Sequence, residues 1–231
     1  MGSTMQTVKK EFTRNGEVVA TLYLGDCLEL LAQGLLKADA LVSDPPYGIG
    51  ITLGGGGKGL LSSNKNKPIH GDGRPFDPTP FISLAKDKPI VLFGAEHYKT
   101  RLPEGGRMLV WDKSCGQGPA ACFADAEFMW TNRKNARCIY RYMWMGVARE
   151  KNNKADGYKK MHVSQKPVAL MAWCIETARI GLGKVVLDPY MGSGSTGVAA
   201  LRTGRKFLGC EIDAEHFETA CGRIAEELER V

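Results

Sequence analysis

The chain has 231 residues, a length that suits one domain over residues 1–231 with a single core. Its hydrophobic content of 43% and charged content of 24% are typical of a folded globular protein and argue against wholesale disorder. No apolar run approaches the roughly 20 residues that a membrane-spanning helix needs. The first ten residues lack the apolar core of a secretory signal, which predicts a cytoplasmic protein.

Seven cysteines raise the question of disulfides or a zinc site. Their number is odd, and no two of them form the C-x-x-C pair that is typical of zinc sites. We therefore expect reduced thiols that are buried as small apolar side chains, and no metal. The cysteines are Cys27, Cys115, Cys122, Cys138, Cys174, Cys210 and Cys221.

Short apolar segments alternate with helical patterns along the chain. The apolar segments are bounded by Gly, Asp or Pro and carry apolar residues on both faces, as buried parallel strands do. This alternation predicts an open, mostly parallel, doubly wound α/β sheet with helices on both faces. In chain order the predicted elements are strand Val18–Leu24, helix Cys27–Leu36 with Asp26 as its N-cap, strands Ala40–Ser43, Ile90–Phe93 and Met108–Trp111, helix Pro167–Arg179, strand Val185–Leu187, helix Val198–Thr203, strand Phe207–Cys210, and a helix capped by Asp213.

The first chemical motif consists of Asp44, Pro45, Pro46 and Tyr47, directly after the predicted strand that ends at Ser43. In an open α/β sheet, ligands bind at the carboxyl ends of the strands. Two successive prolines stiffen the backbone and remove two N–H donors, so carbonyl oxygens are left as acceptors. A carboxylate, a rigid carbonyl and an aromatic ring together suit a flat group that carries an NH2. The alternative is a plain turn that ends the strand.

Two segments interrupt the alternation. Residues 48–75 form a long glycine-rich segment that includes Lys58, and loops of this length are usually functional lids or disordered. The second segment runs from Thr131 to Lys160, where nine basic and two acidic residues give a local charge of +7 in a chain whose net charge is +6. A polyanion-facing surface and a solvated basic loop both explain it. Its basic residues are Arg133, Lys134, Arg137, Arg141, Arg149, Lys151, Lys154, Lys159 and Lys160.

Residues 162–167, His-Val-Ser-Gln-Lys-Pro, lie at the start of a predicted helix. Lys166 and the free N–H groups at the helix start could hold a carboxylate. The same residues also suit a plain capped helix start, and His162 on its own does not indicate a catalytic histidine.

A glycine-rich turn runs from Asp188 to Gly197 after a predicted strand. Strand, glycine turn and helix in this order make a nucleotide-binding crossover, because glycine lets the backbone approach a ligand and the helix start offers free N–H groups. The turn lacks the Gly-Lys-Ser/Thr of a P-loop, whereas Gly192, Gly194 and Gly197 nearly match the dinucleotide pattern G-x-G-x-x-G.

An acidic residue, Glu211, follows the next predicted strand, where a carboxylate can accept both ribose hydroxyls of an adenosine. A nicotinamide cofactor and S-adenosylmethionine (SAM) therefore both fit. Asp188 ahead of the turn favours SAM, because a carboxylate there would attract a cationic amino-acid group and repel a pyrophosphate.

Together these motifs resemble those of the DNA amino-methyltransferases, which move a methyl group from SAM to an exocyclic NH2 of a base. Asp44–Tyr47 matches the family's Asp-Pro-Pro-Tyr in full. The turn Asp188–Gly197 is similar to D-P-F-x-G-S-G-T-T-G, with Tyr190 for Phe and Ser195 for Thr. Residues 162–167 are similar to H-P-T-Q-K-P, with Val and Ser at the second and third positions. The catalytic motif precedes the cofactor motif, which is the permuted, β-type order.

The resemblance implies a Rossmann-like methyltransferase fold with a mobile loop at 48–75 and a small inserted DNA-recognition region at 112–161. It also implies methyl transfer to the N6 amine of an adenine flipped out of double-stranded DNA. The amine would donate hydrogen bonds to Asp44 and the Pro45 carbonyl, and Tyr47 would stack on the base. The residues that it implies are Asp44, Pro45, Pro46 and Tyr47 for catalysis, Asp26, Gln165, Lys166, Asp188, Tyr190, Gly192, Ser193, Gly194, Ser195, Thr196 and Glu211 for the cofactor, and Lys58, Arg133, Lys134, Arg137 and Arg141 for DNA.

Alternatives to this activity differ in their substrate. Cytosine N4 presents the same local chemistry as adenine N6, although Asp at the first motif position is more usual for adenine in this family. A methyltransferase of RNA or of protein glutamine is a more distant alternative. A DNA-binding module without catalysis would bind DNA but not SAM. Many relatives of this motif order are dimers, so the resemblance leaves a homodimer open, and it predicts a cytoplasmic, nucleoid-associated enzyme.

Overall fold

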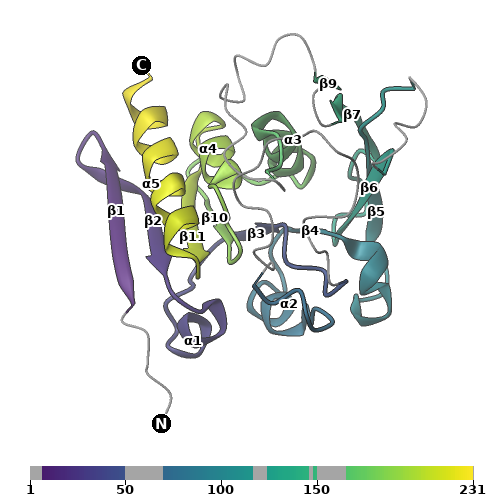
Figure 1. Cartoon of the computed structure of the whole chain (residues 1–231), viewed down its shortest axis with the longest axis horizontal. Coiled ribbons are helices and arrows are strands. Elements are labelled where there is room, and N and C mark those ends of the chain that lie inside the picture. Colours follow the sequence, from purple (N-terminus) through teal and green to yellow (C-terminus); the bar gives the residue numbers. More distant parts are fainter. Residues whose placement is uncertain (1–6, 50–69, 117–123, 146–147, 150–164, 231) are drawn as a thin grey trace, which may run out of the picture.

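The computed structural model describes residues 7–49, 70–116, 124–145, 148–149 and 165–230 (Figure 1). Most of the predicted loop at 48–75, with Lys58, lies outside the described residues, as do Cys122, His162 and most of the chain between Arg149 and Lys160. The predictions for these segments are therefore not addressed by the structure.

A central sheet organises the described part of the chain. Its nine strands there lie in the order β1-β2-β11-β10-β3-β4-β6-β5-β7, and the block from β2 to β4 is entirely parallel. β1, β6 and β5 introduce antiparallel pairs at the two sides of this block. The strands are β1 (Val8–Arg14), β2 (Glu17–Leu24), β3 (Ala40–Ser43), β4 (Ile90–Phe93), β5 (Arg107–Asp112), β6 (Ala126–Thr131), β7 (Ile139–Arg141), β10 (Val185–Asp188) and β11 (Lys206–Glu211), with a separate short pair, β8 (Trp144–Met145) and β9 (Ala148–Arg149).

Helices cover both faces of the sheet, as the alternation predicts (Figure 1). α3, α4 and α5 lie on one face and α1 and α2 on the other. β3 shows why two layers are needed: Ala40 and Val42 pack into the core beneath α3–α5, and Leu41 packs into the core beneath α1 and α2. The helices are α1 (Cys27–Ala32), α2 (Thr79–Leu84), α3 (Val168–Thr177), α4 (Ser195–Arg202) and α5 (Ala214–Glu229), with 3-10 turns at Ala95–His97 and Lys99–Arg101.

None of the helices in the described ranges combines the length and the apolar character that a membrane crossing requires.

The predicted strands agree with the observed ones to within one residue at each end, whereas the helix bounds differ more: α1 and α3 are shorter than predicted, and α4 begins three residues before the predicted start. α1 ends at Ala32 and not at Leu36, because the chain turns at Gly34, which has a φ of +70°. The Asp26 and Asp213 side chains do cap their helices, accepting backbone N–H groups of the first turn.

β6 lies within residues 112–161, the predicted DNA-recognition region. This strand was not predicted, yet it lies within the central sheet between β4 and β5. Its Met129 and Trp130 are buried, and Trp130 lies so close to Gly106 that a Cβ there would come within 2.1 Å of the indole. Part of the predicted recognition region is therefore core structure.

The chain reverses its direction of winding between β3 and β10. From β3 the chain proceeds to β4 on one side, and from β10 it proceeds to β11 on the other side. Open α/β sheets bind ligands at such a switch point, outside the carboxyl ends of the strands. The Asp-Pro-Pro-Tyr motif follows β3 and the glycine turn follows β10, so the topology brings the two predicted motifs to one place.

Candidate active site

The corner after β3 presents a carboxylate that two neighbours hold. The Tyr47 hydroxyl donates a hydrogen bond of 2.6 Å to Asp44 Oδ1, and the Lys166 ammonium donates one of 2.7 Å to Oδ2. Asp44 is half-buried and Pro45 is buried. Burial raises the pKa of Asp44, and the positive charge of Lys166 opposes that rise. Each carboxylate oxygen can accept a further hydrogen bond, so the corner can still receive an amine.

Gly94, at the end of β4, makes room for the Tyr47 ring. Gly94 has a φ of +71°, and a Cβ at this position would come within 2.2 Å of the Tyr47 ring. The ring also stacks on His97, with centroids 5.2 Å apart and planes at 24°. Sequence reasoning missed both residues, although a glycine directly after a buried strand is a signal of close approach. Both therefore help to fix the orientation of Tyr47.

Lys166 lies between two carboxylates and not beside the glycine turn. Besides Asp44 it contacts Glu127 Oε2 at 3.2 Å, and Glu127 Oε1 accepts a hydrogen bond of 2.9 Å from Lys113. Burial opposes the charge on Lys166, but Asp44 and Glu127 outweigh it and raise the lysine pKa, so Lys166 stays protonated. Sequence reasoning missed Glu127 and Lys113; the signal was a charged residue within an apolar strand.

Asp188, at the end of β10, is buried and accepts three hydrogen bonds from its neighbours. Its Oδ1 accepts hydrogen bonds from the Ser43 hydroxyl at 2.6 Å and the Tyr190 amide at 3.1 Å, and its Oδ2 accepts one from the Thr196 hydroxyl at 2.6 Å. Burial raises the pKa of Asp188 to about 6 although these hydrogen bonds oppose the rise. Through Ser43, Asp188 joins the glycine turn directly to the Asp44 corner.

The glycine turn is held from two sides. The Glu211 carboxylate accepts a hydrogen bond of 2.9 Å from the Gly192 amide, and Arg223 of α5 donates to Ser193 and Ser195. Gly194 has a φ of +79°, and a Cβ there would lie 3.0 Å from Ala220. Arg223 was not predicted, because it lies 28 residues beyond Ser195 and meets the turn only in the folded structure.

Of the other predicted cofactor residues, Asp26 and Tyr190 lie next to this turn or in it, and the structure shows Gln165 beside Trp144. Asp26 follows β2, whose neighbour β11 ends at Glu211, and the Gly25 amide donates to the Glu211 carbonyl at 2.8 Å. The Tyr190 ring packs edge-on against Phe76 and Phe81. Gln165 is buried, and its carbonyl accepts a hydrogen bond of 3.2 Å from the Trp144 indole.

The predicted DNA-binding residues divide between the two edges of the sheet. Arg141 ends β7 at the edge that carries the site, where it contacts Asp112 at 3.4 Å and its side chain is 67% exposed. β6 runs antiparallel to β4 and carries the chain to the opposite edge, so Arg133 and Lys134 lie in the turn beyond that edge. Arg137 follows this turn and lies two residues before β7, on the way back to the Asp44 edge. The structure therefore does not bring Arg133 and Lys134 to the site, and the contact of all three residues with DNA stays a prediction.

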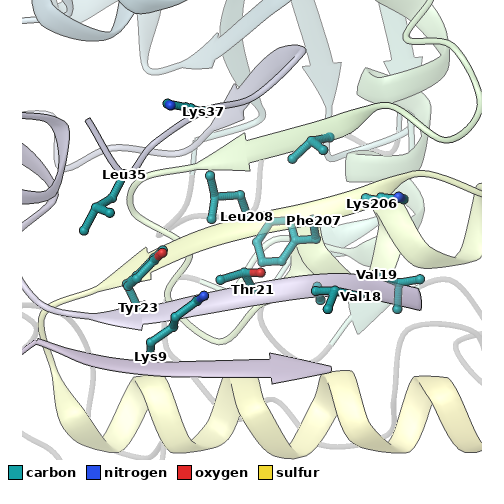
Figure 2. Close-up of a pocket in the computed structure, with 12 residues that line it drawn as sticks. Lys9, Val18, Val19, Thr21, Tyr23, Leu35, Lys37, Lys206, Phe207 and Leu208 are labelled. Carbon is teal, nitrogen blue, oxygen red and sulfur yellow. The ribbon is translucent and has the colours of Figure 1, made fainter. Parts of the chain in front are cut away.

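A surface hollow between β2 and β11 is separate from this site. Figure 2 shows it lined by Tyr23, Leu35, Phe207 and Leu208, with lysines at its rim. Two of these lysines, Lys9 and Lys206, are paired with Glu11 and Glu17. The hollow contains none of the predicted site residues.

The fold and the site define a Rossmann-like DNA methyltransferase class. The crystal structure of M1.HpyAVI in complex with SAM has a TM-score of 0.54 to this chain at 24% identity, covering 88% of this chain and 99% of that one. The cytosine-N4-specific PvuII DNA methyltransferase has a TM-score of 0.56 at 16% identity, covering 91% and 92%. These likenesses concern the fold, and they confirm the predicted fold class.

The chain belongs to the N6_N4_Mtase family of DNA methylases, whose model matches residues 107–222. It is 30% identical over 235 residues to the type II methyltransferase M2.DpnII of Streptococcus pneumoniae, covering 83% of this chain and 84% of that protein. It is 42% identical over 83 residues to the DNA adenine methyltransferase YhdJ of Escherichia coli strain K12, covering 33% of this chain and 28% of that protein. The resemblance to DNA amino-methyltransferases, which use SAM, is thereby confirmed at the level of the family.

Proposed function

We propose that this protein transfers a methyl group from SAM to the N6 amine of an adenine that is flipped out of double-stranded DNA. The observation that carries the proposal is the hydrogen bond between Ser43 and Asp188, which joins the Asp44 corner to the glycine turn at the switch point of the sheet. An acceptor of the methyl group and a methyl donor would meet at this junction.

The residues of the glycine turn fit SAM. A Cβ at Gly192 would meet nothing within 4 Å, so the backbone there is open to a ligand. Asp188 and Glu211 flank the turn with carboxylates, which suit a cationic amino-acid group and a ribose respectively. SAM, when bound, supplies a methyl group on a positively charged sulfur. We assign its binding to the residues around this turn, with Asp26 and Gln165 beside them.

The Asp44 corner suits the other half of the reaction. An exocyclic amine on an aromatic ring is a poor nucleophile, because its lone pair is delocalised into the ring. Hydrogen bonds from that amine to Asp44 and to the Pro45 carbonyl favour a pyramidal nitrogen and stabilise its developing positive charge. Tyr47 holds Asp44 through its hydroxyl and offers a ring face to the base. Pro46 stiffens the corner.

The choice of adenine over cytosine rests on Asp44 and on the relatives. YhdJ is named a DNA adenine methyltransferase, and the motif residue here is aspartate. Digestion of methylated DNA to nucleosides, followed by mass spectrometry, tests the assignment. We expect N6-methyldeoxyadenosine; N4-methyldeoxycytidine would contradict the base assignment, and activity on RNA or protein alone would contradict the DNA assignment.

The role of Asp44 is tested by Asp44→Asn, which keeps the size of the side chain but removes its charge. We expect methyl transfer to fall at least about 100-fold, because the developing cation loses its carboxylate, whereas SAM affinity should stay within about threefold. Single-turnover assays and calorimetry measure the two quantities. Near-normal turnover in the variant would refute the role of Asp44.

We also propose that the loop at 48–75 closes over the bound base and that residues 112–161 contribute DNA contacts. The enzyme would act in the cytoplasm on the nucleoid. A homodimer stays a prediction of the resemblance, which light scattering during size-exclusion chromatography tests.

A further inference from the structure

A chain of alternating charges leads from the Asp44 corner into β6. Asp44 contacts Lys166 at 2.7 Å, Lys166 contacts Glu127 at 3.2 Å, and Glu127 contacts Lys113 at 2.9 Å. The side chains of Lys166 and Lys113 are only 11% and 13% exposed, and those of Asp44 and Glu127 are 21% and 22% exposed. Water therefore screens these charges weakly, so each one affects its neighbours strongly.

Lys166 is fixed in place by more than one contact. Besides its two carboxylates, its ammonium lies 5.5 Å from the centre of the Phe93 ring and 5.9 Å from that of the Tyr47 ring. These contacts come from the corner after β3, from β4 and from β6, and together they hold Lys166 against the Asp44 carboxylate.

Glu127 changes the charge that a substrate would meet. With Lys166 alone, the Asp44 carboxylate would be neutralised and would stabilise a developing cation weakly. The Glu127 carboxylate shares Lys166, so the group of three carries a net charge of −1 beside the place where positive charge develops. Lys113 contacts Glu127 at the other end of the chain and makes the four charges neutral overall, so the excess of negative charge lies at the Asp44 end.

We propose that Lys166 and Glu127 are positioning residues for Asp44: Lys166 orients its carboxylate, and Glu127 preserves its negative field. This proposal rests on the catalytic role of Asp44 that is proposed above. It also assigns to Lys166 a function different from the cofactor contact that the motif alone suggests.

The two residues should shift the acidic limb of the pH–kcat profile in opposite directions. Activity needs ionised Asp44, and loss of Lys166 in Lys166→Met removes a cation, so the limb should move to higher pH by about one unit. Glu127→Gln removes an anion and leaves Lys166 to Asp44 alone, so the limb should move to lower pH while the plateau kcat falls about tenfold. Other described groups that act on Asp44 are Tyr47, Tyr98 and Asp188, and these are unchanged in both variants.

The experiment compares wild type, Lys166→Met, Lys166→Arg, Glu127→Gln and the control Lys184→Met, which removes an exposed lysine paired with Asp39. Lys166→Arg should keep the wild-type limb because it keeps the charge, and Lys184→Met should keep both the limb and the plateau. Circular dichroism confirms folding, and the near-isosteric Glu127→Gln gives a result even if Lys166→Met does not fold. SAM affinity should change less than about threefold in all variants.

Opposite shifts support the proposal. Acidic limbs that coincide, or that shift in the same direction, would overturn it. It would also be overturned if Lys166→Met lost SAM affinity more than tenfold while its acidic limb stayed in place. If the wild type binds SAM but methylates no DNA, the proposed function fails and this inference fails with it. Unmoved limbs in an active enzyme overturn this inference alone.

Discussion

Tyr47 does two things that a sequence motif does not separate. Its hydroxyl donates to Asp44, and in the proposed function its ring stacks on the base, so one side chain would both orient the acceptor of the amine and hold the base. The ring packs closely against Gly94 and stacks on His97. The position of a single ring thus depends on a glycine 47 residues away in sequence.

Gly94→Ala tests that dependence. The added methyl group would meet the Tyr47 ring at 2.2 Å, so the ring must move, and we expect kcat to fall about tenfold or more while SAM affinity stays near wild type. The matched control is Gly105→Ala, which has a similar φ of +76° but meets only the flexible end of Lys134 at 4.0 Å. Comparable kcat values in the two variants would show that backbone strain, and not the ring, causes the loss.

At the scale of the elements, β10 and β3 are coupled by the buried Asp188. Because burial raises its pKa from 3.8 to about 6, the folded state binds more protons than the unfolded chain between these values. Ionised Asp188 therefore lowers stability as pH rises from about 4 to 6, by at most about 3 kcal/mol. This loss of stability is the consequence of a buried negative charge beside the glycine turn.

Asp188→Asn should remove that dependence. The amide can still pair with Ser43, Tyr190 and Thr196, so the variant should gain unfolding free energy relative to wild type as pH rises from 4 to 7. Urea unfolding at several pH values measures this. Asp39→Asn should show the opposite trend, because backbone hydrogen bonding by Val185 lowers the pKa of Asp39 and its contribution is lost as pH falls. A constant difference for Asp188→Asn would contradict the expectation.

For the whole molecule, the active edge and the basic turn after β6 lie at opposite ends of the strands. Arg141 is exposed at the active edge, and Lys134 is exposed at the other. We expect Arg141→Gln to weaken DNA binding and to reduce the slope of log affinity against log salt by about one, and Lys134→Gln to change it less. Fluorescence anisotropy across a salt series measures both slopes. Equal slopes for the two variants would contradict this expectation and would show that the turn with Arg133 and Lys134 also faces DNA.

The sequence predicts the centre of this fold better than its margins. β3 and β4 could be bounded to the residue, because they are apolar on both faces and end at polar residues or glycine. β1 could not, because its residues are almost all exposed and alternate charges with few apolar side chains. β6 was missed because Glu127 interrupts its apolar residues and because it directly precedes the basic segment, which drew the whole region into a predicted recognition region.

The site residues also differ in how well the sequence predicts them. Asp44, Asp188 and Glu211 could be identified, because each follows a strand at the ligand-binding edge. The contact of Lys166 with Asp44 spans 122 residues, so no local spacing reveals it. The same holds for Glu127 and Arg223, whose roles depend on strand order and helix packing.

The hydrogen bond between Ser43 and Asp188 spans 145 residues, and β10 lies in the middle of the sheet between β3 and β11. During synthesis on the ribosome, the Asp44 corner and β3 are therefore made long before β10, the strand with which β3 pairs. A nascent chain that ends before β10 lacks Asp188 and the glycine turn. With the SAM-binding role proposed for this turn, we expect incomplete translation products to leave DNA unmethylated.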